Sequence, residues 1–389
     1  MTEIYILSAA RTAIGTFGGA LSGFAPYDLA TIAAKAAIER AGIDAAQIGT
    51  TVFGHVINTE PKDMYLSRLA AMQAGVPESV PALNVNRLCG SGLQAIVSAA
   101  QGLMLGDADF ALAGGAEVMS RSPYVMPSAR WGQKMGDAKM IDMMTGALTC
   151  PFGTGHMGVT AENIASEMGF SREEQDAFAL LSQERAAAAI AAGRFKEQIT
   201  PVEIVTRKGT TIFDTDEHPK TTTLEALVKL KPAFQKDGTV TAGNASGLND
   251  GAGALILARG DKLGGLKPRA RLMGYAVAGV APHVMGYGPI PAVKLLSEKL
   301  GVTPQSFDVV ESNEAFAAQA LAVSKALELD PAKVNPNGGA IALGHPIGAS
   351  GAVIATKALY ELERSGGKTA LVTMCIGGGQ GIAVAFERV

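Results

Sequence analysis

Cysteine is scarce in this sequence, and its few copies are far apart. Cys89, Cys150 and Cys375 are the only three cysteines in 389 residues, and no C-x-x-C pair occurs. Such spacing suggests neither a disulfide framework nor a zinc site, and it fits a reducing compartment best. We therefore expect no bound metal.

An excess of positive charge is missing as well. Lys and Arg number 33 against 36 for Asp and Glu, without a basic block, which argues against nucleic acid or an anionic membrane as the main partner. The first three residues lead directly into a strand-like segment from Ile4 to Ala9, which leaves no room for a signal peptide, and no apolar run reaches membrane-spanning length. We expect a cytoplasmic protein, to which a small anionic ligand could still bind.

The chain is long. Its 389 residues exceed what one hydrophobic core usually supports, and they suggest two or three domains. An internal repeat organises this length. Residues Ile38–Gly42 resemble Ser297–Gly301, and Cys89–Gly92 resemble Gly348–Gly351. Both matches have one offset, because 298 − 39 and 351 − 92 both give 259. Two matches in one register indicate a duplication.

Each copy has the same predicted order of elements. A helix is followed by a strand (50–56 and 309–311), a Gly-rich turn, a buried helix and a last strand that ends in glycines (110–113 and 369–374). Alternating strands and helices place crossover helices on the faces of a sheet, so each copy should form an α/β layer.

The stretch between the copies has no counterpart and is interpreted as an insertion. The predicted domains are an N-terminal half (1–118 plus 250–268), an inserted α+β loop domain (119–249) and a C-terminal half (269–389). Residues 120–144 of the insertion are rich in Met, Pro and Gly and contain Trp131, the only tryptophan, as is typical of an interaction loop or lid.

Two further parts of the insertion have clear patterns. The stretch 160–192 is strongly helical, with a capping box that begins at Ser171. The stretch 239–253 is dense in Gly, Asn, Ser and Thr and is predicted to be a loop, after which 254–258 should return to the first sheet as a strand.

The segment Asn86–Gly92 places Cys89 where an apolar run meets the start of a helix. Unpaired N–H groups and the helix dipole there favour a thiolate, which should pull the pKa of the thiol below its ordinary value of about 8.5. Free cysteine is also among the most buried residue types, so this segment alone fits a core position equally well. The apolar face of the helix comprises Leu93, Ile96, Ala100 and Leu103.

Three segments of the second copy could supply partners for this thiol. His345 lies between Gly344 and Pro346 and could deprotonate it, although an ordinary surface histidine is the commoner case. Cys375 leaves a strand ahead of 377–381, whose glycine amides could hold an oxyanion or could simply pack the sheet. Asn313 ends another strand and could position a water, or could be a helix N-cap.

One glycine-rich motif has the form of a dinucleotide-binding site but lies in the wrong sequence context. Residues 153–158 have the form G-x-G-x-x-G, which predicts a dinucleotide site only after a strand in a βαβ unit. Pro151 breaks the strand that this site would need, so the motif carries little weight, and Cys150 beside it is interpreted as structural or incidental.

Taken together, these motifs closely resemble the thiolases, and in particular the acetyl-CoA acetyltransferase branch (biosynthetic β-ketothiolases). The resemblance extends from the first strand to the last residues, and it implies duplicated halves in a layered α-β-α-β-α sandwich. It rests on Asn86–Gly92, Asn313–Ala317, Asn335–Gly339, Gly344–Pro346 and Cys375–Gly381, with Arg11–Gly15 and Gly243–Gly247 also fitting the pattern.

The resemblance implies a role for each candidate. Cys89 would be acylated, His345 would take its proton, and Cys375 would act as acid and base on the second substrate. One oxyanion site would comprise His345 with a water held by Asn313, and the other the N–H groups of Cys89 and Gly377. Transfer through a thioester implies ping-pong kinetics.

The resemblance further implies reversible condensation of acetyl-CoA to acetoacetyl-CoA and CoA, or reaction with a short acyl-CoA. No cofactor is expected, because CoA is substrate and product. Lys220 is matched to an arginine that relatives often place near the CoA phosphates, although the spacing there differs. The loop at 120–144 resembles the segment that joins dimers into homotetramers. The expected CoA contacts are Leu148, His156, Met157, Lys220, Ala233, Phe234, Ser246, Leu248, Met285, Ala315 and Phe316.

Three alternatives remain at this point. The first is a broader-chain 3-ketoacyl-CoA thiolase that acts in degradation, since packing within a pocket decides the acyl-chain preference. A decarboxylating condensing enzyme would normally lack the second cysteine, and a non-catalytic protein that binds acyl-CoA or lipid would have lost at least one of Cys89, His345 and Cys375. The presence of all three residues disfavours the last two.

Overall fold

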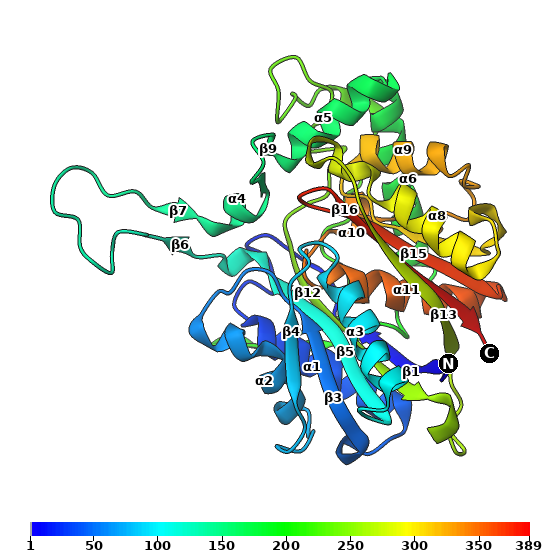
Figure 1. Cartoon of the computed structure of the whole chain (residues 1–389). Helices are drawn as coiled ribbons and strands as arrows, with labels where there is room; N and C mark the ends of the chain where they lie inside the picture. Colours follow the sequence, from blue (N-terminus) through cyan, green and yellow to red (C-terminus); the bar gives the residue numbers. More distant parts are fainter. Residues whose placement is uncertain (1) are drawn as a thin grey trace.

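The computed structural model describes residues 2–389 and is built around one mixed sheet (Figure 1). Its ten strands run in the order β14-β15-β16-β13-β1-β12-β5-β3-β4, with β2 paired to β12. The strands are β1 (Ile4–Arg11), β2 (Gly15–Thr16), β3 (Ile48–Gly54), β4 (Ala82–Val85), β5 (Phe110–Val118), β12 (Asn249–Arg259), β13 (Ala270–Gly279), β14 (Val309–Ser312), β15 (Thr369–Ile376) and β16 (Gln380–Arg388).

The sheet consists of two halves that are only narrowly joined. Strands β1 and β13 share just two residue pairs, Tyr5 with Arg271 and Ile6 with Ala270. In contrast, β5 pairs with β12, and β13 with β16, over their whole lengths. Each half therefore forms its own layer, one from strands before residue 260 and one from strands after residue 269.

Helices cover both faces of each half, so that three helical layers alternate with the two half-sheets to give five layers in all. Helices α1 and α2 pack on the outer face of the first half, α8 and α9 on the outer face of the second, and α3 and α11 lie in the shared middle layer. The predicted α-β-α-β-α sandwich is thus confirmed. The helices of these layers are α1 (Pro26–Ala41), α2 (Leu66–Gln73), α3 (Ser91–Leu105), α8 (Pro289–Leu300), α9 (Ala317–Ala326), α10 (Ala340–Leu343) and α11 (Ser350–Ser365).

Strand β12 shows how the sequence fills these layers. Leu255 and Leu257 contribute to the core around the middle helices, whereas Ile256 contributes to the core beneath α1. Side chains alternate across a strand, so a strand with apolar residues at every position is buried on both faces. This explains why the strands here are continuous apolar runs.

The central helices α3 and α11 are related by the repeat and pack very closely. They begin at Ser91 and Ser350, which are 259 residues apart since 350 − 91 is 259, as the repeat requires. A Cβ on Gly92 would lie 2.7 Å from the backbone nitrogen of Ala352, and one on Gly351 would lie 2.1 Å from that of Leu93. Only glycine permits this approach, which brings the two helix N-termini together.

Helix α3 also corrects one expectation about apolar runs. The stretch Leu88–Leu105 has 18 residues with a mean hydropathy of 1.3, and so it is long and apolar enough to cross a membrane. In the fold this helix lies in the middle layer, where Leu93 and Ile96 are fully buried. Its hydropathy is accounted for by core packing between two sheets, which the run length alone could not reveal.

Two predicted segments need different boundaries. Strand β5 continues through Gly114 to Val118 instead of ending at Ala113, because Gly114 pairs across the ladder with Ala254 of β12. Strand β12 begins at Asn249 instead of 254, because its first residues pair with β2 and β5. In both places the pairing partner overrides the turn-like composition.

The insertion carries a long arm and a helical body (Figure 1). The arm, residues 124–142, extends from the body between β6 and β7, and Trp131 and Met135 on it are 86% and 91% exposed. The helical body breaks at Gly169, and α6 begins after a capping box at Ser171. The elements are β6 (Tyr124–Val125), β7 (Ile141–Asp142), α4 (Met143–Ala147), β8 (Thr149–Cys150), β9 (Gly155–His156), α5 (Met157–Met168), α6 (Arg172–Ala191), β10 (Val202–Thr206), β11 (Gly209–Phe213) and α7 (Leu224–Val228).

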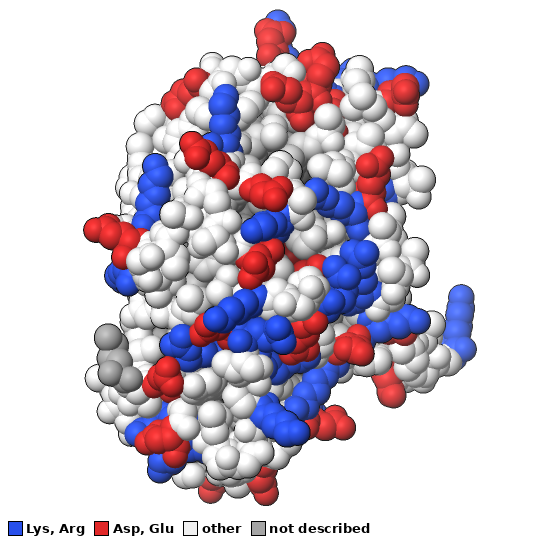
Figure 2. Space-filling model, turned by 90° about the vertical axis from the view of Figure 1, so that its right-hand side faces the viewer, with Lys and Arg blue, Asp and Glu red and all other residues white. Residues whose placement is uncertain are grey.

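The surface shown in Figure 2 carries charges of both signs. Lys and Arg side chains are interspersed with Asp and Glu over this face. Near the chain termini, Arg269 pairs with Glu363 and Arg271 with Glu387. In such pairs the basic and acidic groups neutralise one another.

Candidate active site

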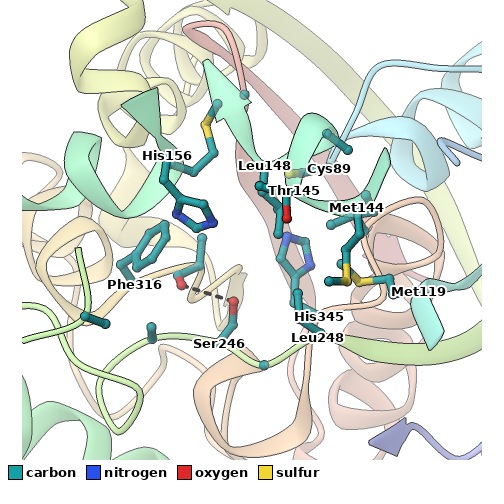
Figure 3. A pocket seen from close by; sticks show the side chains of 18 of the residues that line it. Cys89, Met119, Met144, Thr145, Leu148, His156, Ser246, Leu248, Phe316 and His345 are labelled. Carbon is teal, nitrogen blue, oxygen red and sulfur yellow. Dashed lines mark hydrogen bonds between the residues drawn. The ribbon is translucent and has the colours of Figure 1, made fainter. Parts of the chain in front are cut away.

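A cavity of about 490 Å³ lies where the two halves and the insertion meet (Figure 3). Every residue expected to contact CoA lines this cavity, and so do Cys89, His345 and Gly377. Cys375 and Asn313 lie outside its lining and are buried. The fold thus brings the candidates from both copies together with the expected CoA contacts from the insertion and the C-terminal half.

The turn before α3 holds Cys89 in a strained backbone. Leu88 has a φ of 45°, which a residue with a branched side chain rarely adopts. Its N–H donates to Oδ1 of Asn86 at 2.9 Å, while the hydroxyl of Ser91 donates to its carbonyl at 2.6 Å and accepts from the N–H of Arg87 at 2.9 Å. These side chains fix the turn, so the thiol has a defined position at the start of the helix.

The expected thiolate at Cys89 is wrong for the free protein. Cys89 is partly exposed to the cavity, yet its desolvation raises the pKa of the thiol, and this effect exceeds the lowering by hydrogen bonds from the N–H groups of Gly377 and Cys89 itself. The helix end alone suggested a lowered pKa, but the cost of burying a charge dominates. Two backbone N–H groups nevertheless face the sulfur, where they could stabilise negative charge on an attached group.

His345 is held as a neutral base. Its backbone N–H donates to Oδ1 of Asn249 at 2.9 Å, and its ring Nδ1 lies 2.6 Å from Oγ of Ser350. The Ser350 hydroxyl donates to the carbonyl of Pro346 at 2.9 Å, so Nδ1 must carry the ring proton and Nε2 must be the free acceptor. Burial lowers the pKa of His345 to about 4, which keeps the ring neutral at pH 7.

Asn313 lies beside the catalytic face of this ring. Its Nδ2 is 3.5 Å from Nε2 of His345, and its N–H donates to the carbonyl of Thr373 at 3.0 Å. Its Oδ1 is buried without a hydrogen-bond partner among the described residues. A buried amide oxygen without a partner is a suitable place for an ordered water.

Cys375 is the next-to-last residue of strand β15 and packs against the cavity residues Met157 and Phe316. Its side chain is fully buried, and both burial and the nearby Cys89 raise its pKa far above the ordinary value for a thiol. Gly378 and Gly379 follow with φ values of 82° and 88°, a turn that glycine favours. This turn leaves the N–H of Gly377 directed at the sulfur of Cys89.

Family comparison agrees with this geometry. The family models "Thiolase, N-terminal domain" and "Thiolase, C-terminal domain" match residues 4–261 and 266–388. The chain belongs to the thiolase family. The expectation drawn from its motifs is thereby confirmed.

Individual thiolases resemble the whole chain. A protein named beta-ketothiolase BktB from Cupriavidus necator is 59% identical over 100% of this chain and 99% of its own. An acetyl-CoA acetyltransferase from Pseudomonas aeruginosa is 50% identical over 100% of both. Two crystal structures of human mitochondrial 3-ketoacyl-CoA thiolase, the second in complex with CoA, are 45% identical and cover 100% of this chain. Their TM-scores are 0.98 and 0.96, and the matches cover 99% and 98% of their own chains.

Several lining residues of this thiolase were not expected from its sequence. Met119 and Met144 pack with Ile347 beside Cys89, although they flank or belong to the loop interpreted as an interaction surface. His218 lines the cavity near Lys220, with its Nδ1 buried and without a partner among the described residues. Burial lowers the pKa of His218 to about 4, helped by the charge of Lys220. The excess of methionine was the only sequence signal for this wall.

Proposed function

We propose that this thiolase condenses two molecules of acetyl-CoA to acetoacetyl-CoA and CoA, and catalyses the reverse thiolysis, through an acyl group on Cys89. The observation that carries the proposal is the meeting of Cys89, His345 and Gly377 in one cavity, with Cys375 buried close to Cys89. The names of the relatives support the same reaction.

The first half-reaction acylates Cys89. Nε2 of His345 takes the thiol proton while the sulfur attacks the thioester carbonyl carbon, which forms a C–S bond and a tetrahedral oxyanion. Collapse of this intermediate breaks the bond to the CoA sulfur. Cys375 donates its proton to that sulfur, so CoA leaves as a thiol, Cys375 becomes a thiolate, and His345 keeps the proton from Cys89.

The second half-reaction forms the carbon–carbon bond. The Cys375 thiolate removes an α-proton from a second acetyl-CoA, and the resulting carbanion attacks the acyl carbon on Cys89. The tetrahedral intermediate releases the Cys89 thiolate, which regains its proton from His345. A strongly basic thiolate suits the removal of a weakly acidic α-proton, and the raised pKa of Cys375 supports this role.

Two sets of donors would stabilise the oxyanions. The N–H groups of Cys89 and Gly377 face the sulfur, and we assign them to the oxygen of the acyl group on Cys89. Protonated Nε2 of His345, with a water held by Asn313, is assigned to the thioester oxygen of the other substrate. Losing one such donor typically costs about 100- to 1000-fold in kcat.

The remainder of the cavity fits the long CoA arm. Its walls are largely apolar, as the hydrocarbon parts of the arm require, and His156 stacks on Phe234 with ring centroids 4.7 Å apart. Lys220 lies at this cavity as a point charge for a phosphate. The complex of a relative with CoA supports CoA as a ligand.

The acyl chain and the assembly belong to the same proposal. A thiolase that accepts a broader range of acyl-chain lengths is the second candidate, because Met119 and Met144 lie beside Cys89 and the methionine side chain adapts to irregular shapes.

The exposed arm at 124–142 is proposed to join dimers into a homotetramer. A cytoplasmic location fits the three free cysteines.

Thiolysis rates test the proposal directly. The purified protein with CoA should cleave acetoacetyl-CoA, and rates with 3-ketovaleryl-CoA and longer 3-ketoacyl-CoA substrates should rank its chain preference. Absence of thiolysis with every substrate would contradict the proposal and favour a protein that only binds acyl-CoA.

A further inference from the structure

Glu117 is a buried carboxylate that the reaction steps above do not use. It lies near the end of β5 and is fully buried. Its Oε2 accepts hydrogen bonds from the N–H groups of Val56 at 3.1 Å and Gly348 at 2.9 Å, and its Oε1 accepts from Ile57 at 3.1 Å. A carboxylate that satisfies three backbone donors is expensive to replace by a neutral group.

These donors belong to both halves of the protein. Val56 and Ile57 follow strand β3 of the first half, whereas Gly348 lies in the second half between His345 and the start of α11. Ile57 and Ile347, the residue before Gly348, share one apolar cluster with Cys89. Glu117 therefore links the loop that carries His345 to the apolar cluster that contains Cys89.

The fit around this carboxylate leaves little freedom. A Cβ on Gly348 would lie 2.4 Å from Oε2 of Glu117 and 3.1 Å from the Cα of His55. The ring Nδ1 of His55 lies 3.0 Å from the carbonyl of Ala116 and 3.3 Å from Oε1 of Glu117, so this nitrogen must carry a proton. The loop, the carboxylate and the imidazole thus support one another.

We propose that Glu117 is a positioning residue, which sets the distance between the sulfur of Cys89 and Nε2 of His345 by holding Gly348 against the first half. This inference rests on the proposed acyl transfer through Cys89. Glu117 touches no reacting atom, so it would act only through the segments that it joins. A misplacement of about 1 Å at a reacting pair can cost about 100-fold in rate.

The charge of Glu117 provides a second, independent signature. Near Cys89, burial keeps His345 neutral and raises the pKa of Cys375, while Glu117 acts on Cys89 through its charge and has His55 Nδ1 3.3 Å from its Oε1. Burial raises the pKa of Glu117, although His55 and three backbone N–H groups favour its ionised form, and the negative charge of that form raises the pKa of Cys89. Removal of this charge should therefore make Cys89 easier to ionise, even while it disturbs the geometry.

The test compares three variants. Glu117→Gln removes the charge and one acceptor, and Glu117→Asp keeps the charge but shortens the reach. Glu162→Gln is the matched control, since Glu162 is also buried and accepts from the N–H groups of Thr239 and Val240 but does not line the cavity. The pH profile of iodoacetamide alkylation at Cys89, located by peptide mass spectrometry, is measured beside thiolysis kinetics.

Glu117→Gln should shift the alkylation profile to lower pH and lower kcat by about 100-fold, with KM for acetoacetyl-CoA changed little. Glu117→Asp should keep the wild-type profile and still lose kcat, and Glu162→Gln should keep the wild-type profile. Wild-type kcat in Glu117→Gln, or equal losses and profiles in Glu117→Gln and Glu162→Gln, would overturn the inference.

If Glu117→Gln fails to fold, the kcat of Glu117→Asp decides the question. A wild-type kcat in Glu117→Asp would then overturn the inference. Failure of the proposed function has a different result, namely the absence of thiolysis in the wild-type protein itself.

Discussion

The close contact between α3 and α11 should control catalysis, and Gly92→Ala tests this. The added Cβ would lie 2.7 Å from the nitrogen of Ala352 and 3.1 Å from the carbonyl oxygen of Gly348. Ordinary contact begins near 3.4 Å, so the helices must separate by about 0.7 Å, since 3.4 − 2.7 is 0.7. Both contacted atoms are backbone, so no side chain can rotate to relieve the clash.

This separation would act on the pair Cys89 and His345, because each precedes one of the two helices. Overpacking of this kind costs about 1–3 kcal/mol of unfolding free energy. A shift approaching 1 Å at a reacting pair can lower kcat by up to about 100-fold. Gly92→Ala should therefore lower the stability to urea and should lower the thiolysis kcat by at least about 10-fold.

Gly102→Ala is a control in the same helix. The nearest atom to its added Cβ is Oδ2 of Asp107 at 3.6 Å, an ordinary contact. Alanine stabilises a helix relative to glycine by about 0.5–1 kcal/mol, so this variant should keep wild-type kcat and gain stability. Wild-type kcat in Gly92→Ala, or an equal loss in both variants, would refute the argument.

Three further predictions concern other parts of the molecule. Cys375→Ala should still become acetylated by acetyl-CoA, more slowly because CoA must then leave as a thiolate, but should lose condensation by at least about 100-fold, which product formation measures. His345→Asn should reduce the loss of stability on acidification. Because the pKa of His345 is about 4 in the folded protein and about 6.5 when unfolded, the unfolded state binds more protons between these pH values, and the wild type should lose up to about 3 kcal/mol of unfolding free energy as the pH falls from 6.5 to 4. Urea unfolding at both pH values should show a smaller loss in the variant. Trp131→Glu should convert the proposed tetramer to dimers in light scattering while each dimer stays folded.

Much of the fold could be predicted because the repeat and the alternation of elements are local patterns. The shared offset located the equivalence of α3 and α11, which begin at Ser91 and Ser350. The C-terminal end of β5 could not be found in this way, although its start at Phe110 was predicted. Gly114 looks like a terminator, yet a Cβ there would lie 2.4 Å from the carbonyl oxygen of Gly253, so the glycine serves close packing within the sheet.

In the candidate site, too, local motifs were predictable from the sequence, whereas properties that depend on distant segments were not. Motifs around Cys89, His345 and Cys375 indicated which residues matter, since their chemistry is readable from residue type and order. The pKa of Cys89 was not readable, because it depends on burial by segments distant in the sequence. His218 was equally hidden, since its orientation into the cavity depends on the fold of the insertion.

The central claim is that Cys89 carries the acyl group between the two substrates. The most direct measurement is to incubate Cys375→Ala with radiolabelled acetyl-CoA, quench in acid and locate the label by peptide mass spectrometry. We predict one acetyl group on Cys89 and none after the additional substitution Cys89→Ala. Label on another residue, or condensation without any covalent acetyl group, would contradict the account.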